Sequence, residues 1–248
     1  MKSARWAIVS MMALLALSTS TFALGGNQVY QGISMDGVGG HVSQNAANAA
    51  VVYGDNNYVS QEVDQNAQGN DITQSGANAA VVVGNDNYVG QGIHQDAEGN
   101  TISQSGANAI AVVGNDNYVA QEVSQKAQGN EIFQTGKNSG TIAGDGNVLM
   151  QRTFAHAMTK PAERTDPVQT MSNFAYIMGS YNTVGQDISG RAIIGSGNGP
   201  VDQSGSNVIK TPEMMWNSLG QAVSFVGESG PGSEVKQSAQ NEIWIGTT

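Results

Sequence analysis

The chain has 248 residues, with 20 acidic side chains, 10 basic ones and no cysteine. Its formal net charge of −10 argues against nucleic-acid binding, because nucleic-acid-binding proteins present a basic footprint. Without cysteine there are no disulfides, so an exported chain needs another source of stability. Charged residues make up only 12% of a chain with 32 glycines, which by composition alone fits a disordered polypeptide. The regular repeat described below argues against disorder.

Residues 1–23 have the pattern of a secretory signal peptide. Lys2 and Arg5 precede an apolar run from Trp6 to Leu17, and the small residues that follow predict cleavage after Ala23. A membrane anchor is the alternative, but the apolar run is short for a span of about 20 residues. We therefore expect a secreted protein, located outside the cell or at its surface and not inserted in a membrane once the signal is removed.

From residue 24 onward the chain repeats a unit of 30 residues. The copies are clearest at 54–83, 84–113 and 114–143, and residues 24–53 match them at the same offsets. A fixed period of this length predicts stacked supersecondary units rather than one central core. We therefore expect regular repeats over 24–143 and degenerate repeats with longer arches over 144–248, about seven rounds in all.

Each round contains two stretches with strict period-two alternation, which predicts two β-strands. In the second round these stretches are 57–65 and 70–82. They could pair as a hairpin or face each other as a β-arch. Repetition favours the arch, because rounds stacked about 4.8 Å apart give every backbone group a partner. The predicted fold is all-β, a two-sheet β-solenoid of stacked strand–arch–strand repeats.

The two connections of each round differ in composition. The first contains Gly69, repeated as Gly99 and Gly129, where we expect the arch to use a positive φ. The second has turn residues such as Gly54-Asp55-Asn56. One later insertion, residues 152–165, predicts a longer arch.

Asn and Gln recur on the same side of each strand as Val and Ile. Asn57 and Gln61 share a side with Val59, whereas the other side carries Glu62 and Asp64. Charges belong in water more strongly than amides do, so we expect the amides inside rather than facing solvent. A buried amide without a partner costs about 1–3 kcal/mol. In a column each amide can donate to the round above, later in sequence, and accept from the round below. The predicted stacking residues are Asn27, Gln31, Gln44, Asn48, Asn57, Gln61, Gln74, Asn78, Asn87, Gln91, Gln104, Asn108, Asn117, Gln121, Gln134 and Asn138.

The strings ITQSGANAA (72–80) and ISQSGANAI (102–110) resemble the curlin repeat, with its Gln-x-Gly-x-x-Asn-x-Ala pattern. The resemblance covers 27–143 well and 144–248 loosely. It implies secreted subunits of curli-like functional amyloid fibres with internal Asn and Gln ladders. Sheath proteins with similar Asn-rich repeats are also compatible.

The outer side of the repeats carries recurring tyrosines and an unusually apolar stripe. The tyrosines fit either contact with a neighbouring filament or ordinary strand positions near a turn. A soluble monomer rarely exposes a continuous apolar stripe, which favours lateral packing between solenoids over coverage by later rounds. The candidate lateral contacts are Tyr58, Tyr88, Tyr118, Val81, Val83 and Val113.

The sequence gives little sign of catalysis or metal binding. His41, His94 and His156 are scattered along the sequence. One turn aspartate per round, such as Asp55, supplies too few oxygen ligands to predict a Ca²⁺ site. We expect no enzyme activity, metal or cofactor.

Two functions are compatible with this pattern. The first is a structural subunit that self-assembles, through edges near 27–52 and 235–245, into an amyloid-like extracellular fibre or sheath of a biofilm or cell-surface matrix. Its main partner is then itself, with export machinery and a nucleating subunit as further candidates. The alternative is a monomeric β-solenoid that acts as an adhesin or a ligand-binding surface.

Overall fold

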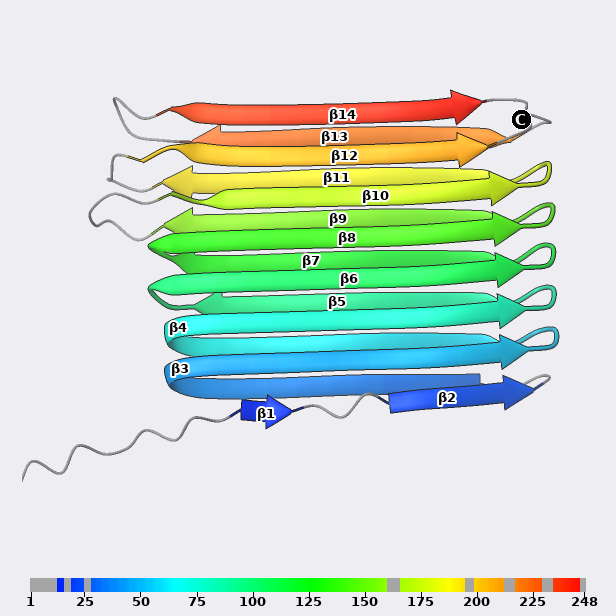
Figure 1. Ribbon diagram of the computed structural model, residues 1–248, viewed down its shortest axis with the longest axis horizontal. Helices are drawn as coiled ribbons and strands as arrows, with labels where there is room; N and C mark the ends of the chain where they lie inside the picture. The colour runs from blue at the N-terminus through cyan, green and yellow to red at the C-terminus, as the bar shows by residue number, and fades with distance from the viewer. Residues whose placement is uncertain are drawn as a thin grey trace, which may run out of the picture.

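The computed structural model describes residues 13–15, 19–24, 28–159, 166–194, 199–211, 217–228 and 234–245. All regular structure in these ranges is β, and the strands form a single stack (Figure 1). The strands are β1 (Ala13–Leu15), β2 (Thr19–Leu24), β3 (Gln28–Tyr53), β4 (Tyr58–Val83), β5 (Tyr88–Glu98), β6 (Thr101–Val113), β7 (Tyr118–Gly129), β8 (Glu131–Ala143), β9 (Val148–Thr159), β10 (Val168–Met178), β11 (Thr183–Ile194), β12 (Val201–Thr211), β13 (Ser218–Glu228) and β14 (Val235–Ile245).

All strand pairs in the described part of the chain are parallel, and equivalent residues of successive rounds pair with each other. Gln61 in β4 is opposite Gln91 in β5, which is opposite Gln121 in β7. The offset is 30 residues in the regular part and becomes 35 between β9 and β11 and 34 between β10 and β12. This register confirms the predicted all-β solenoid of about seven turns.

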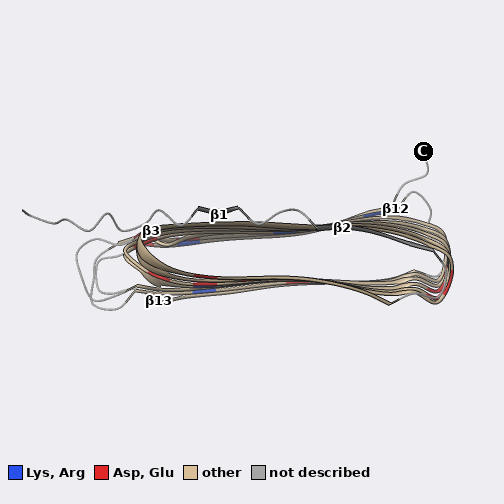
Figure 2. Ribbon diagram, turned by 90° about the horizontal axis from the view of Figure 1, so that it is seen from below, with Lys and Arg blue, Asp and Glu red and all other residues tan. Residues whose placement is uncertain are grey.

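Hydrogen bonds join the strands into a single 14-stranded sheet, because β3 and β4 each pass through the arch without a break. From β4 the sheet continues through β5, β7, β9, β11 and β13 in one direction, which we call the first run. In the other direction it continues through β6, β8, β10, β12 and β14, the second run. The two runs face each other across a narrow interior (Figure 2).

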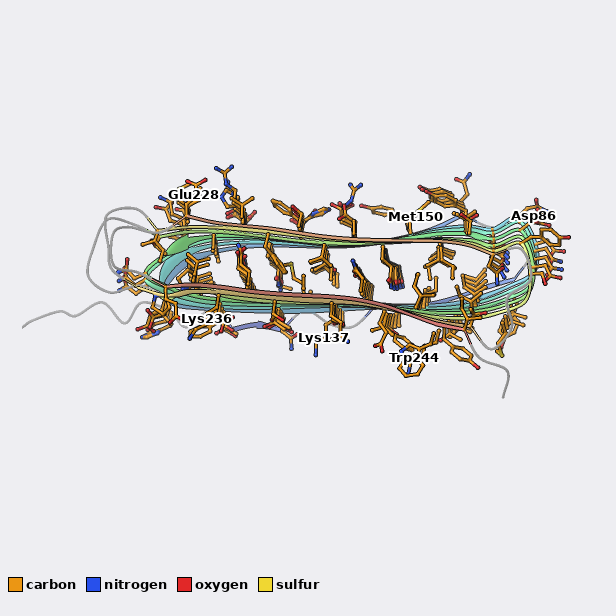
Figure 3. All side chains as sticks on the ribbon, turned by 90° about the horizontal axis from the view of Figure 1, so that it is seen from above. Asp86, Lys137, Met150, Glu228, Lys236 and Trp244 are labelled. Carbon is orange, nitrogen blue, oxygen red and sulfur yellow. The ribbon has the colours of Figure 1, made fainter. Side chains whose placement is uncertain are left out.

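Side chains alternate between this interior and the outside, as the period-two pattern predicts. Val59, Val63 and Ile72 are buried and belong to apolar columns that continue from round to round. Outward-pointing residues include Met150 on the first run and Trp244 on the second (Figure 3). The interior is therefore one side chain deep from each run.

The glycine of each arch is needed for space, not for a positive φ. None of Gly69, Gly99 and Gly129 has a φ in the left-handed region, so that expectation is wrong. A Cβ added to Gly99 would lie 2.5 Å from the carbonyl oxygen of Gly69 in the preceding round. Stacked arches thus leave no room for a side chain at this position.

The other connection does use left-handed backbone, as its turn residues predict. Gly84 has a φ of 139° and Asp86 a φ of 55°. Asp55 lies in the equivalent turn one round earlier, and its Oδ1 accepts the backbone N–H of Asn85 at 2.7 Å. The side chain of Asp55 therefore links its turn to the equivalent turn of the next round.

The structure differs from the longer arch predicted for residues 152–165. Residues 152–159 belong to β9, with Thr153, Ala155 and Ala157 buried, so they are strand and not arch. Their alternation was hidden because two of the inner residues are alanines. Residues 160–165 lie outside the described part of the chain.

The predicted signal peptide contains β1 and all of β2 except Leu24, and both strands pair with the outer edge of β3. Ala23, the predicted cleavage residue, is opposite Val52. None of the described residues forms a helix that is long and apolar enough to span a membrane. Cleavage after Ala23 stays a prediction.

Interior glycines predict a strong sensitivity to added volume. A Cβ on Gly106 would lie 2.6 Å from Cγ1 of Val123 in the facing run. We expect Gly106→Ala to lower the free energy of unfolding by about 1–3 kcal/mol, because overpacking a closed interior strains it. Gly90→Ala is the matched control, since the nearest atom to its Cβ would be 3.9 Å away. Urea unfolding measures both, and equal effects would contradict the inside and outside assignment.

Candidate functional site

The predicted amide residues form continuous buried columns through the interior. All of those in the described part of the chain are buried: Gln31, Gln44, Asn48, Asn57, Gln61, Gln74, Asn78, Asn87, Gln91, Gln104, Asn108, Asn117, Gln121, Gln134 and Asn138. Asn27 lies outside the described residues. Charged side chains flank these columns only on the outer side, which places the amides inside as predicted.

The glutamine columns donate toward the preceding round. Nε2 of Gln91 donates to Oε1 of Gln61, and Nε2 of Gln121 donates to Oε1 of Gln91, both at 2.8 Å. The same column extends to Gln221, and a second one runs from Gln44 to Gln237. The direction is opposite to the expected donation toward later rounds.

The asparagine columns donate in the expected direction, toward the following round. Nδ2 of Asn78 donates to Oδ1 of Asn108 at 3.1 Å, and that column runs from Asn48 to Asn241. At the turn end, Nδ2 of Asn57 donates to Oδ1 of Asn87 at 3.0 Å. The backbone N–H of Asn57 donates to the same oxygen at 2.8 Å. Neighbouring columns therefore have opposite polarity.

The second N–H of many of these amides crosses the interior to a backbone carbonyl of the facing run. Asn78 donates to the oxygen of Gly92 at 2.8 Å, and Gln91 donates to that of Ala109 at 3.2 Å. Each such amide makes one bond in each direction along its column and one across the interior. A polar interior is tolerated because these groups are satisfied by one another.

One further amide column is not among the predicted stacking residues. Gln65, Gln95 and Gln125 are buried. Nε2 of Gln95 donates to Oε1 of Gln65, and Nε2 of Gln125 donates to Oε1 of Gln95, both at 2.7 Å. Their spacing of 30 residues was visible in the sequence, on the same side as Gln61. The column ends at Gln125, whose Oε1 has no partner because Ala155 occupies the next round.

The outer tyrosines form a stacked row. The rings of Tyr58 and Tyr88, and those of Tyr88 and Tyr118, have centroids 5.0 Å apart and lie nearly parallel. Tyr58, Tyr88 and Tyr118 are 46%, 40% and 39% exposed. On the second run, Val81 and Val113 are exposed and Val83 is half-buried. Their role in lateral contact stays a prediction.

The histidines are less scattered than their sequence positions indicate. Nδ1 of His41 lies 2.8 Å from Oδ2 of Asp71. His94 is the register partner of Asp64, so the stacking brings an imidazole next to carboxylates of the round before. His156 is half-buried on the outside of β9, and its Nε2 has no hydrogen-bond partner.

No family model, curated protein or solved structure matches this chain.

The column bonds predict a large effect for an inner amide. Gln91→Leu keeps the approximate volume but leaves Oε1 of Gln61 without its donor and Nε2 of Gln121 without its acceptor. We expect the free energy of unfolding to fall by about 2–4 kcal/mol, because two buried polar groups lose partners. Glu122→Ser, on the outer side of the next round, should change it by less than about 0.5 kcal/mol. Urea denaturation compares the two, and a larger loss for Glu122→Ser would refute the assignment.

His156 predicts a sensitivity to acid. Partial burial, with smaller contributions from nearby Arg191 and Lys126, lowers the pKa of His156. The unfolded chain therefore binds this proton first, and stability is lost as the pH falls below the ordinary histidine pKa of about 6.5. We expect His156→Gln to lose less stability than the parent between pH 7 and pH 5, measured by denaturant unfolding. Identical pH profiles for the two proteins would exclude this effect.

Proposed function

We propose that this protein is a structural subunit that polymerises end to end into an amyloid-like extracellular fibre or sheath. In this proposal the two runs act as the two sheets of a continuous solenoid, and each copy adds about seven rounds. The chain is exported through its signal peptide, acts outside the cell as a homopolymer and has no enzymatic role. The resemblance of its repeats to curlin repeats supports the same assignment.

The C-terminal end of the stack has an open surface. Within the described residues, β13 pairs only with β11 and β14 only with β12. Ile243, Trp244 and Ile245 are each 44% or more exposed, although the equivalents of Ile243 and Ile245 in the previous round, Ile209 and Thr211, are buried. An edge strand of this length with exposed apolar residues is a template for another strand.

The single observation that carries the proposal is that the first round matches this open surface position by position. Following the register from round to round places Gln31 in the column of Gln221, and Gln44 in that of Gln237. Six of these inner equivalents are Val29 with Leu219, Gln31 with Gln221, Ile33 with Val223, Gln44 with Gln237, Asn48 with Asn241 and Ala50 with Ile243. Apolar residues meet apolar residues, and amides meet amides.

Hydrogen-bond polarity is also complementary between the two ends. Continuing the observed directions, Gln44 of the next copy donates to Oε1 of Gln237, and Nδ2 of Asn241 donates to Asn48 of the next copy. In the single chain the register partner of Gln44 on its outer side is Leu14 of β1 and not a glutamine, and Nε2 of Gln44 donates to the carbonyl of Met35 at 2.9 Å. Stacking would return this amide to the arrangement found in the inner rounds.

The leader shows that the N-terminal edge can accept a parallel strand. β2 pairs with the second half of β3, with Thr19 opposite Asn48 and Leu24 opposite Tyr53. Cleavage after Ala23 would remove all of β2 except Leu24. The edge of β3 would then be open to the last round of another copy.

The proposal is tested with the chain lacking its predicted signal, residues 24–248. We expect fibres with a meridional reflection at about 4.8 Å. Ile243→Lys should slow seeded elongation at least tenfold, because stacking would bury the lysine without a partner. Trp244→Lys is the matched control, since this neighbouring side chain points outward (Figure 3) and should leave elongation within about twofold. Equal effects of both variants would refute end-to-end stacking, and a persistent monomer would favour the adhesin or ligand-binding alternative.

A further inference from the structure

Three metal-ligating side chains from two adjacent rounds converge on the outer side of the first run. Glu62 and Asp64 lie two residues apart on β4, and His94 of β5 is the register partner of Asp64. One carboxylate oxygen from each acid and one imidazole nitrogen all lie within 4.8 Å of one another. No other group of three such residues in the described part of the chain meets this criterion. The cluster is local and does not repeat along the stack.

A glycine makes this convergence possible. Gly92 is the register partner of Glu62, and Gly32 is its partner in the round before. With glycine on both sides, no side chain separates Glu62 from His94. A Cβ at Gly92 would be in ordinary contact with Nε2 of His94, at 3.6 Å, so a longer side chain would occupy the space between the two groups. In the next round the column continues with Glu122, so the opening is confined to this place.

In the part of the chain that the structure describes, no lysine or arginine forms an ion pair with the two acids of the cluster. Among the described residues, neither Glu62 nor Asp64 has a Lys or Arg partner, because Lys126 is paired with Asp96 and Arg152 with Asp187. The phenol of Tyr30 donates to Oε2 of Glu62 at 3.0 Å. Partial burial and the neighbouring charge of Glu62 raise the pKa of Asp64, while His94 acts in the opposite direction. Two adjacent carboxylates with no lysine or arginine partner favour a bound dication.

The donor set selects the kind of cation. Ca²⁺ and Mg²⁺ take oxygen ligands, whereas an imidazole with two carboxylates suits Zn²⁺ and neighbouring divalent transition metals. Zinc bonds of about 2.0–2.2 Å require ligand atoms roughly 3.3 Å apart. Glu62 and Asp64 are half-buried and His94 is exposed, so small rotations about side-chain bonds can close the remaining distance.

We propose that Glu62, Asp64 and His94 form a binding site for a divalent transition metal such as Zn²⁺, which links the second and third rounds. Three protein ligands leave at least one coordination position open. His94 and Glu62 line a groove that runs across the rounds beside Tyr118, so the open position faces solvent. A water molecule or a donor group from outside the chain can occupy it. The site lies within one chain and does not depend on polymerisation.

The test is a Zn²⁺ titration of tag-free protein, residues 24–248, after treatment with a chelator and its removal. Isothermal calorimetry should show one site per chain, and a tenfold excess of Ca²⁺ or Mg²⁺ should leave its affinity within about twofold. His94→Gln should weaken Zn²⁺ binding at least tenfold. Co²⁺ in place of Zn²⁺ should give visible absorption bands in the parent that are lost in this variant.

His41→Gln is the matched control, because His41 is also exposed beside an acid, Asp71, but has only this one carboxylate partner. It should bind Zn²⁺ as the parent does. Circular dichroism of both variants checks that the β-structure is retained. Unchanged binding in His94→Gln, or an equal loss in His41→Gln, would overturn the proposed site. Competition by Ca²⁺ at equal affinity would overturn its assignment to a transition metal.

Discussion

The structure depends on hydrogen bonds between identical amide side chains of successive rounds. An amide carries both donors and an acceptor, so a like neighbour one strand spacing away satisfies it, whereas Val or Ile does not. Gln91 shows the full arrangement, with bonds to Gln61, to Gln121 and to the carbonyl of Ala109 across the interior. A slip of two residues would place amides against apolar side chains. These bonds therefore fix both the register of the rounds and the approach of the two runs.

The polarity of the columns has a consequence for the ends of the stack. Gln columns donate toward the N-terminal end and Asn columns toward the C-terminal end, so the two end faces differ. If two C-terminal faces met with Gln237 opposite Gln237, an acceptor would oppose an acceptor, and with Asn241 opposite Asn241 a donor would oppose a donor. A C-terminal face against an N-terminal face continues every column. The same interaction that holds the rounds together thus favours head-to-tail growth with a defined direction.

The outer side obeys a weaker constraint. One outer column contains Gly32, Glu62, Gly92, Glu122 and Arg152 in successive rounds, whereas the adjacent inner column is glutamine throughout. Outer side chains are solvated and need no like neighbour. Local features such as the stacked tyrosines and the cluster around His94 can therefore differ between rounds without disturbing the stack. Specific chemistry on this scaffold is to be sought on the outside.

The sequence by itself determined the period, the strands and the inward direction of residues such as Asn57 and Gln61, because alternation is a local property of an extended chain. It did not determine the direction of the glutamine bonds or the end of a column at Gln125, because both depend on what lies in the next round and across the interior. Gly99 was assigned the wrong physical role, since only the stacked arches reveal the close approach. The meeting of His94 with Glu62 likewise required the register, which places residues about 30 positions apart within contact.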